Sequence, residues 1–97
     1  MSEYCVKLTD EAKYQYAAIE STDDFTRVTK AMQHLKKFAK MGAVYDPIFE
    51  AAPAPEGVRV VYAGHYGVYY LVRAEEVLVV SVSDQRRNPR DRFIFTD

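Results

Sequence analysis

The chain is poor in several features, and each shortage excludes a class of protein. Cys5 is the only cysteine among 97 residues, so no disulfide can form within the chain and no cluster of thiolates can bind a metal. This cysteine usage is typical of the reducing cytoplasm, where we expect the protein to reside. No apolar run approaches the ~20 residues that a membrane helix requires, and no signal-peptide pattern is present, so membrane insertion and secretion are not expected.

Net charge is also small. The formal charge is −1, with 48% hydrophobic and 28% charged residues, which is typical of a globular protein and disfavours binding of polyanions over the whole surface. Any contact with nucleic acid must therefore come from a local patch. Residues 1–97 are expected to form a single domain, because a chain of this length can bury one core but not two.

The segment from Val58 to Asp84 is nearly continuous in β-branched and aromatic residues. Two short polar breaks divide it into three predicted strands: Val58–Ala63, Tyr66–Arg73 and Val77–Ser83. The break at Gly64-His65 places a glycine where a type II′ turn needs a positive φ, so the strands are predicted to form an antiparallel meander. Large apolar residues alternate onto both faces of the second strand, which is therefore expected to be central, with its far face a candidate binding surface.

Two helices are predicted before the meander. Tyr4 to Leu8 alternates as a short strand, and Thr9 then caps a helix from Asp10 to about Glu20. A second helix begins after the capping residues 21–24 and is expected to end at Gly42. Its apolar stripe holds Phe25, Val28, Met32, Leu35 and Ala39, and its opposite face holds Arg27, Lys30, Lys36, Lys37 and Lys40.

The predicted fold class is α+β, with the N-terminal strand followed by an antiparallel helix hairpin that packs on one face of an antiparallel sheet of about four strands. The first strand is expected to run antiparallel to whichever outer strand of the meander it joins. Residues 42–57 contain three of the four prolines and are predicted to be a loop without regular structure.

This order of elements resembles the RelE/ParE superfamily of toxins from bacterial type II toxin–antitoxin modules. The resemblance covers nearly the whole chain and rests on "VKLTDEAKYQYAAI", "PEGVRVVYAGHYGVYYLV" and "VLVVSVSDQRR". It implies a growth-inhibiting toxin that a cognate antitoxin neutralises. RelE-like members cut messenger RNA on the ribosome, whereas ParE-like members inhibit DNA gyrase and need no nuclease site. The resemblance favours mRNA cleavage here, with gyrase inhibition or a non-toxic binding module on the same fold as the alternatives.

The mRNA-cleaving interpretation assigns roles to particular residues. By position, Arg86 and Arg87 carry over from the family as cations that stabilise the phosphate, and His65 and Tyr66 as proton carriers. Arg59 and Arg90 are predicted to bind RNA, because a guanidinium matches two phosphate oxygens. No cofactor is expected, because no glycine-rich phosphate loop follows a strand, and His34 and His65 lack the spacing of metal ligands.

Other observations favour a simpler interpretation of the same residues. The arginine that the RelE-like pattern places early in the central strand is here Gly67, and a near-zero net charge suits a protein inhibitor better than an RNA-cutting enzyme. A histidine at a hairpin tip is more often a solvated turn residue than a catalyst, and Tyr66 is more often a packing residue. The arginines of the final segment alternate with Asp84 and Asp91, which favours local charge pairing.

Overall fold

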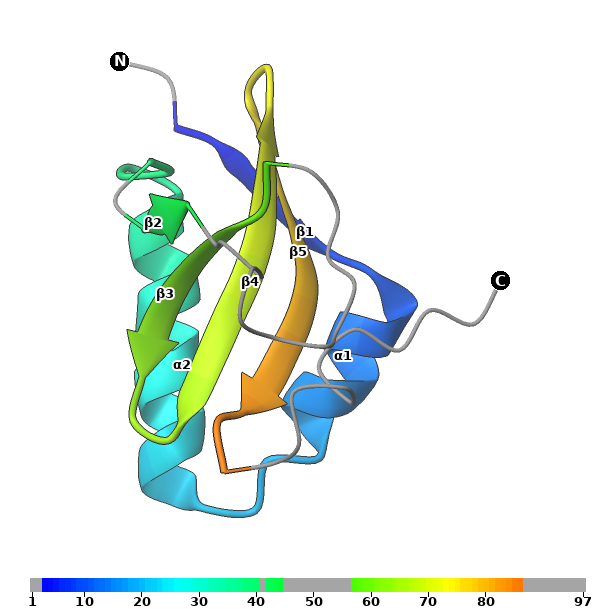
Figure 1. Ribbon diagram of the computed structural model, residues 1–97, viewed down its shortest axis with the longest axis vertical. Helices are drawn as coiled ribbons and strands as arrows, with labels where there is room; N and C mark the ends of the chain where they lie inside the picture. The colour runs from blue at the N-terminus through cyan, green and yellow to red at the C-terminus, as the bar shows by residue number, and fades with distance from the viewer. Residues whose placement is uncertain (1–2, 41, 45–56, 87–97) are drawn as a thin grey trace.

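The computed structural model describes residues 3–40, 42–44 and 57–86, and these form one sheet covered by two helices. The elements are β1 (Cys5–Leu8), α1 (Asp10–Ala17), α2 (Thr22–Leu35), β2 (Ala43–Val44), β3 (Arg59–Ala63), β4 (Tyr66–Arg73) and β5 (Glu76–Asp84). The strand order is β1-β5-β4-β3-β2, and both helices lie on the same face of the sheet (Figure 1). The predicted α+β fold is confirmed, and β4 is the central strand.

The direction predicted for the first strand was wrong. β1 pairs with β5 in parallel, from Cys5 opposite Glu76 to Leu8 opposite Val79, while the pairs within the meander are antiparallel. The reason is topological. The backbone nitrogen of Tyr4 donates to the carbonyl of Lys36, so α2 returns the chain to the end where β1 starts. β3 and β5 then run in the same direction as β1 (Figure 1).

Both helices are shorter than their patterns predicted, and Gly42 does not end α2 as a C-terminal cap. The helix ends at Leu35, and Gly42 follows seven residues later where the chain meets β3. A Cβ at Gly42 would lie 2.6 Å from both the Tyr70 hydroxyl and the Val60 carbonyl oxygen, so only glycine fits this close approach. Next to it, Ala43 and Val44 pair with β3, which adds a fifth strand where only a loop was predicted.

The sheet separates two apolar clusters, as the alternation along β4 predicted. The helix-facing cluster contains Ala12, Ile19, Val28, Ala31, Met32, Leu35, Ala39, Ala63, Val68, Tyr70, Val77, Val79 and Val82. The second cluster lies on the far face and contains Val58, Val60, Tyr69, Leu71 and Val80, all of which are buried. The centre of the far face, which was a candidate binding surface, is therefore buried.

Gln15 of α1 forms hydrogen bonds with Ser81 and Val82 of β5, after Val79, the last residue of β5 that pairs with β1. β5 contains an irregularity where its register with β4 shifts between Tyr69 and Tyr70. The side-chain oxygen of Gln15 accepts hydrogen bonds from the backbone nitrogen of Val82 at 2.8 Å and from the Ser81 hydroxyl at 3.3 Å. This contact satisfies a backbone donor that a strand partner would otherwise take, and it fixes α1 beside the end of β5.

Candidate functional site

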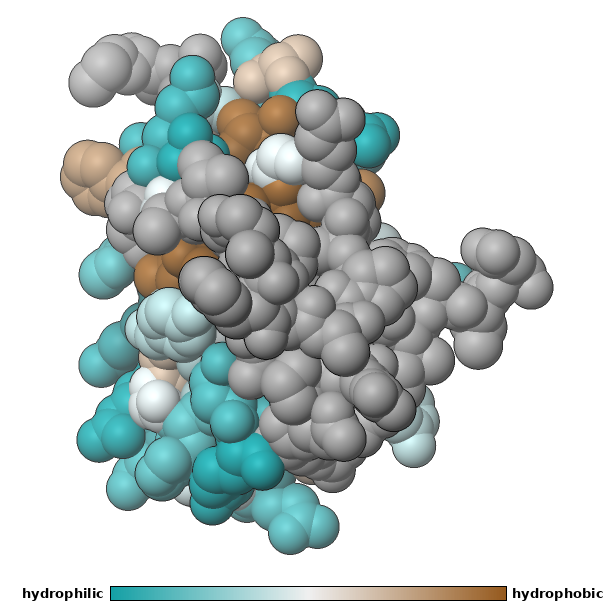
Figure 2. Space-filling model, viewed as in Figure 1, coloured by the Kyte–Doolittle hydropathy of each residue, from teal (hydrophilic) through white to brown (hydrophobic). Residues whose placement is uncertain are grey.

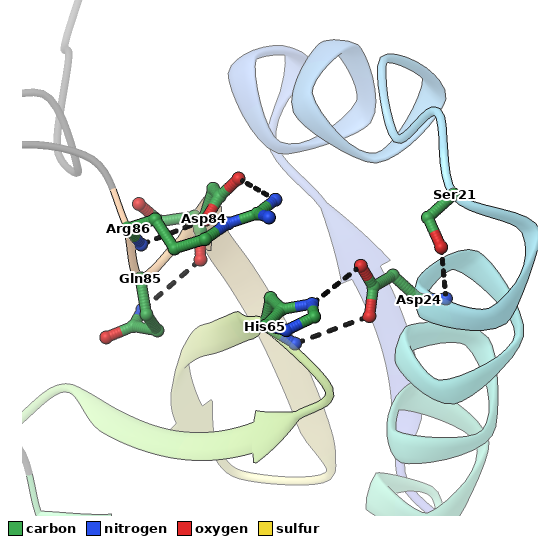
Figure 3. Close-up of polar contacts among 7 residues, drawn as sticks. Ser21, Asp24, His65, Asp84, Gln85 and Arg86 are labelled. Atoms are coloured by element: carbon green, nitrogen blue, oxygen red, sulfur yellow. Dashed lines mark hydrogen bonds and ion pairs between the residues drawn. The ribbon is translucent and has the colours of Figure 1, made fainter.

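The turn between β3 and β4 is held against the start of α2 by one carboxylate. Ser21 caps α2 and accepts a hydrogen bond from the backbone nitrogen of Asp24, whose side chain is only 5% exposed. The Asp24 carboxylate accepts from the backbone nitrogen of His65 at 3.3 Å and lies 3.2 Å from its Nδ1 (Figure 3). Asp24 therefore binds both the main chain and the ring of His65.

Gly64 makes this contact possible. Its φ of +62° is the positive angle that the sequence predicted for this turn. In addition, a Cβ at this position would lie 2.3 Å from Oδ1 of Asp24. Glycine is thus required both by the turn and by the approach of the carboxylate.

The environment of Asp24 favours its charged form. The hydrogen bond from the His65 ring lowers the pKa of Asp24 most, and the backbone hydrogen bond from His65 and the positive charge of Arg27 act in the same direction. Burial opposes these effects but is smaller than the first of them. Asp24 is therefore an anion that the fold has already paired.

A second pair lies at the end of β5. Nε and Nη2 of Arg86 donate to the two carboxylate oxygens of Asp84 at 2.9 and 2.7 Å, and the backbone nitrogen of Arg86 donates to the same carboxylate at 2.9 Å. This bidentate contact raises the pKa of Arg86 further above its ordinary value. The Arg86 side chain is 64% exposed, but its hydrogen-bonding edge is occupied by Asp84.

Gln85 connects the two pairs. Its backbone nitrogen donates to the carbonyl of His65 at 2.8 Å, and its side-chain amide donates to the Tyr69 hydroxyl at 3.1 Å. The amide fills the space next to Gly67, where a Cβ would lie 2.5 Å from Nε2 of Gln85 and 2.9 Å from the Tyr69 ring. An arginine at position 67 would have to displace the Gln85 amide and press on the Tyr69 ring, so the packing favours glycine here.

We call Asp24, His65, Asp84 and Arg86 the paired-charge site (Figure 3). Beside it is a pocket of about 340 Å³, lined by Ala18, Glu20, Ser21, Asp24, Tyr66, Asp84 and Arg86. Two of the predicted catalytic residues, Tyr66 and Arg86, line this pocket. The third, His65, is not part of the lining but contacts Asp24, which is. The described residues of the lining contribute three carboxylates and one guanidinium, so this part of the pocket is acidic rather than basic.

The remaining predicted site residues are not brought to this pocket. Arg59 lies at the other end of β3, where its Nη1 donates to the carbonyls of Gly42 at 2.9 Å and Lys40 at 3.3 Å. It thereby holds the chain after α2 against β3. Arg87 and Arg90 lie outside the described residues.

Sequence reasoning missed Asp24 as a partner of His65, because its position at the start of α2 indicated only helix capping. No pattern in the sequence pairs positions 24 and 65, which meet only through the packing of α2 on the sheet. Across residues 3–40, 42–44 and 57–86, no group of three or more potential metal ligands is found. The helices in these ranges are also too short and too polar to cross a membrane.

Comparisons with known proteins agree with this architecture. Residues 6–89 match a family model described as "ParE toxin of type II toxin-antitoxin system, parDE". A solved structure from P. aeruginosa, described as its chromosomal ParDE toxin–antitoxin system, superposes with a TM-score of 0.63 at 16% identity. The superposition covers 84% of this chain and 96% of the other chain, and at this identity it shows the shared fold. A search of curated proteins found no match.

Proposed function

Because the chain belongs to the ParE family of toxins of type II toxin–antitoxin systems, we propose that it stops growth by binding and inhibiting DNA gyrase. In the sequence analysis, gyrase inhibition was an alternative to mRNA cleavage. The proposal requires a surface that recognises a protein, and it requires no nuclease centre. The family match and the charge of the pocket both favour it.

The observation that carries the proposal is the acidic character of the pocket beside the paired-charge site. Cleavage of RNA needs unpaired cations that stabilise the extra negative charge of the transition state. Among the described residues that line the pocket, Arg86 is the one cation and is bound to Asp84, while Glu20 and Asp24 add two further carboxylates. A phosphate entering the pocket would meet repulsion from these groups before it reached Arg86.

Ribosome-dependent mRNA cleavage remains the second candidate, and one observation favours it. Tyr66 and Arg86, two residues predicted to act on RNA, line the same pocket. In this alternative Arg86 leaves Asp84 when substrate binds and, with Arg87, neutralises the phosphate, while His65 and Tyr66 carry protons.

The two candidates give different results in cells and with purified gyrase. We expect expression of the protein to arrest growth without new mRNA ends, and the purified protein to inhibit supercoiling by gyrase. Arg86→Ala and His65→Ala test the alternative, with Arg73→Ala as the control because Arg73 is exposed at the opposite end of the sheet. New mRNA ends that disappear in Arg86→Ala but persist in Arg73→Ala would overturn the gyrase proposal.

Membership of the family also implies a cognate antitoxin, and we propose that it docks on the helix hairpin. The centre of the sheet's far face is buried, whereas Tyr14 on α1 is 74% exposed and Phe25 on α2 is 38% exposed. Exposed aromatic residues are favourable anchors for a partner protein. The complex should survive gel filtration, and the double variant Tyr14→Ser/Phe25→Ser should weaken it. Tyr62→Ser is the matched control, because Tyr62 is 62% exposed on the sheet instead; equal weakening by Tyr62→Ser would contradict the proposal.

A further inference from the structure

The outer side of α2 carries the strongest concentration of positive charge in the described residues. No aspartate or glutamate occurs from Phe25 to Lys40, while five of the chain's 13 lysines and arginines do. These five are all exposed and form what we call the α2 ridge: Arg27, Lys30, Lys36, Lys37 and Lys40. Because the whole chain has a net charge of −1, the rest of it is acidic and the ridge is a segregated patch.

Helical geometry brings the main cations of the ridge into line. Arg27, Lys30 and Lys37 are separated by three and seven residues, so they lie on one side of the helix, away from the buried Val28 and Leu35. The backbone nitrogen of Phe38 donates to the carbonyl of His34, so the helical path continues past Leu35 to Lys37. At ~1.5 Å per residue, the line from Arg27 to Lys37 is about 15 Å long. Figure 2 shows hydrophilic residues along the edge of the molecule where α2 lies.

The lysines of the ridge are not neutralised by the fold. The ion pairs among the described residues are Lys7 with Glu76, His65 with Asp24 and Arg86 with Asp84, and none of them includes a ridge residue. Arg27 lies near enough to Asp24 to lower the pKa of that carboxyl. The ridge therefore differs from the paired-charge site, where each cation faces a carboxylate.

The composition of the ridge favours a phosphate backbone over a protein partner. Between Thr26 and Lys37 every apolar side chain is buried, and the exposed residues are all polar or charged. The core of a protein interface needs aromatic or apolar anchors, and the exposed ones near this stretch are Phe25 and Phe38, one before it and one after it. Single-stranded nucleic acids also bind through stacking on aromatic side chains, which this stretch lacks.

We propose that the α2 ridge binds the phosphate backbone of duplex DNA without reading its sequence. A straight helix fits the wide major groove of B-form DNA, whereas the corresponding groove of duplex RNA is deep and narrow. The lysines supply point charges that position a backbone without specifying bases. The proposal goes beyond toxin action and does not depend on it, because DNA binding can be measured without gyrase. Arg27 at the start of the ridge lies beside Asp24 of the paired-charge site, and the ridge extends away from that site toward Lys37. A toxin bound to gyrase would nevertheless meet DNA on its target.

Fluorescence anisotropy with a short labelled duplex and the purified protein tests the proposal, with no gyrase present. If about four ridge cations contact phosphates, the logarithm of the affinity should fall with the logarithm of salt concentration with a slope of about −3 to −4. Lys30→Gln/Lys37→Gln should weaken binding strongly at low salt and reduce the magnitude of the slope by about 2. Lys30→Arg/Lys37→Arg, which keeps the charge, should restore both.

The matched control is Lys13→Gln/Arg73→Gln, which removes the same charge from exposed positions off the ridge. It should leave most of the affinity and the salt slope unchanged, and thermal unfolding should show that both double variants stay folded. Equal losses in the two double variants would overturn the proposal, as would a lack of DNA binding at low salt. Equal binding of single-stranded DNA, duplex RNA or an acidic peptide of the same charge would also overturn it. If the parent protein binds duplex DNA as expected but does not inhibit gyrase, the result would instead count against the proposed toxin mechanism.

Discussion

Two aspartates, each paired with a nitrogen-bearing side chain, lie close together at one end of the sheet, yet the two pairs have different roles. The pair of Asp24 and His65 joins residues 41 positions apart, and its carboxylate is nearly buried. The pair of Asp84 and Arg86 joins residues two positions apart, and its guanidinium is 64% exposed. The first pair therefore connects a helix to a turn of the sheet, whereas the second shapes only the end of β5.

The difference shows that the contribution of such a pair to the stability of the fold depends on which parts of the chain it joins. A buried carboxylate with several donors leaves those donors unsatisfied when it is removed, which destabilises the fold. An exposed local pair exchanges its partner for water at little cost. The same contrast bears on function, because only the exposed Arg86 can change partners without disturbing the packing of α2.

The largest effect is expected from Gly67→Arg, which tests whether the two pairs depend on Gln85 between them. The new side chain has to displace the Gln85 amide and press on the Tyr69 ring, so we expect a loss of roughly 1–3 kcal/mol in the free energy of unfolding. Urea denaturation measures it. Tyr62→Arg, at the facing position of β3, is the control because this side chain is 62% exposed. An unchanged urea concentration at the midpoint of unfolding for Gly67→Arg would show that Gln85 and Tyr69 can move aside at little cost in free energy.

The second-largest effect is expected from Asp24→Asn, which removes the carboxylate of the long-range pair and leaves the pair of Asp84 and Arg86 intact. Asp24→Asn removes the charge that binds the ring and the main chain of His65, and we expect the Tm to fall by roughly 5 °C at neutral pH. The backbone of the β3–β4 turn should also exchange its amide hydrogens faster. A Tm equal to that of the parent would mean that the long-range pair contributes nothing to stability and does not differ from the local pair in this respect.

Acid should remove the same contribution in the parent protein. The pKa of Asp24 is lower in the folded state than its ordinary value of 3.8, mainly because of the His65 ring. Stability from this group is therefore present above 3.8 and is lost as the pH falls through the lower folded pKa. The difference in Tm between the parent and Asp24→Asn should shrink as the pH falls below 3.8. A difference that grows in acid would contradict the assignment.

The smallest effect is expected from Arg86→Gln, the matched change in the local pair. Because the arginine is exposed and paired only with a near neighbour, thermal unfolding should give the same Tm as the parent. A fall as large as that of Asp24→Asn would show that Arg86 holds more of the fold than the bond to Asp84 indicates.

Much of the fold could be predicted from local patterns. The meander followed from alternation and from Gly64, and the predicted strand ends differ from the observed ones by one residue or fewer. The helix hairpin followed from the capping residues and the apolar stripe around Val28 and Leu35. The end of α2 was misplaced because Gly42 was interpreted as a helix cap, when its real constraint is the approach of β4 and β3.

The candidate site could be predicted only in part. Arg86, His65 and Tyr66 were named as candidates, because turn residues and charges after a strand are visible in the sequence, and their roles remain predictions. Their partners were not, since Asp24 lies 41 positions from His65 and its burial depends on how α2 packs. The roles proposed from the sequence for Arg87 and Arg90 remain predictions, because these residues lie outside the described part of the chain.

The parallel pairing of β1 with β5 determines when the sheet can be completed. Cys5 lies opposite Glu76, so β1 has no strand partner until β5 has been synthesised. Contacts of such long range slow folding, and they keep the nascent chain incomplete through most of translation. The sheet edge that β1 forms, with α1 directly after it, is therefore among the last parts of the described fold to be completed.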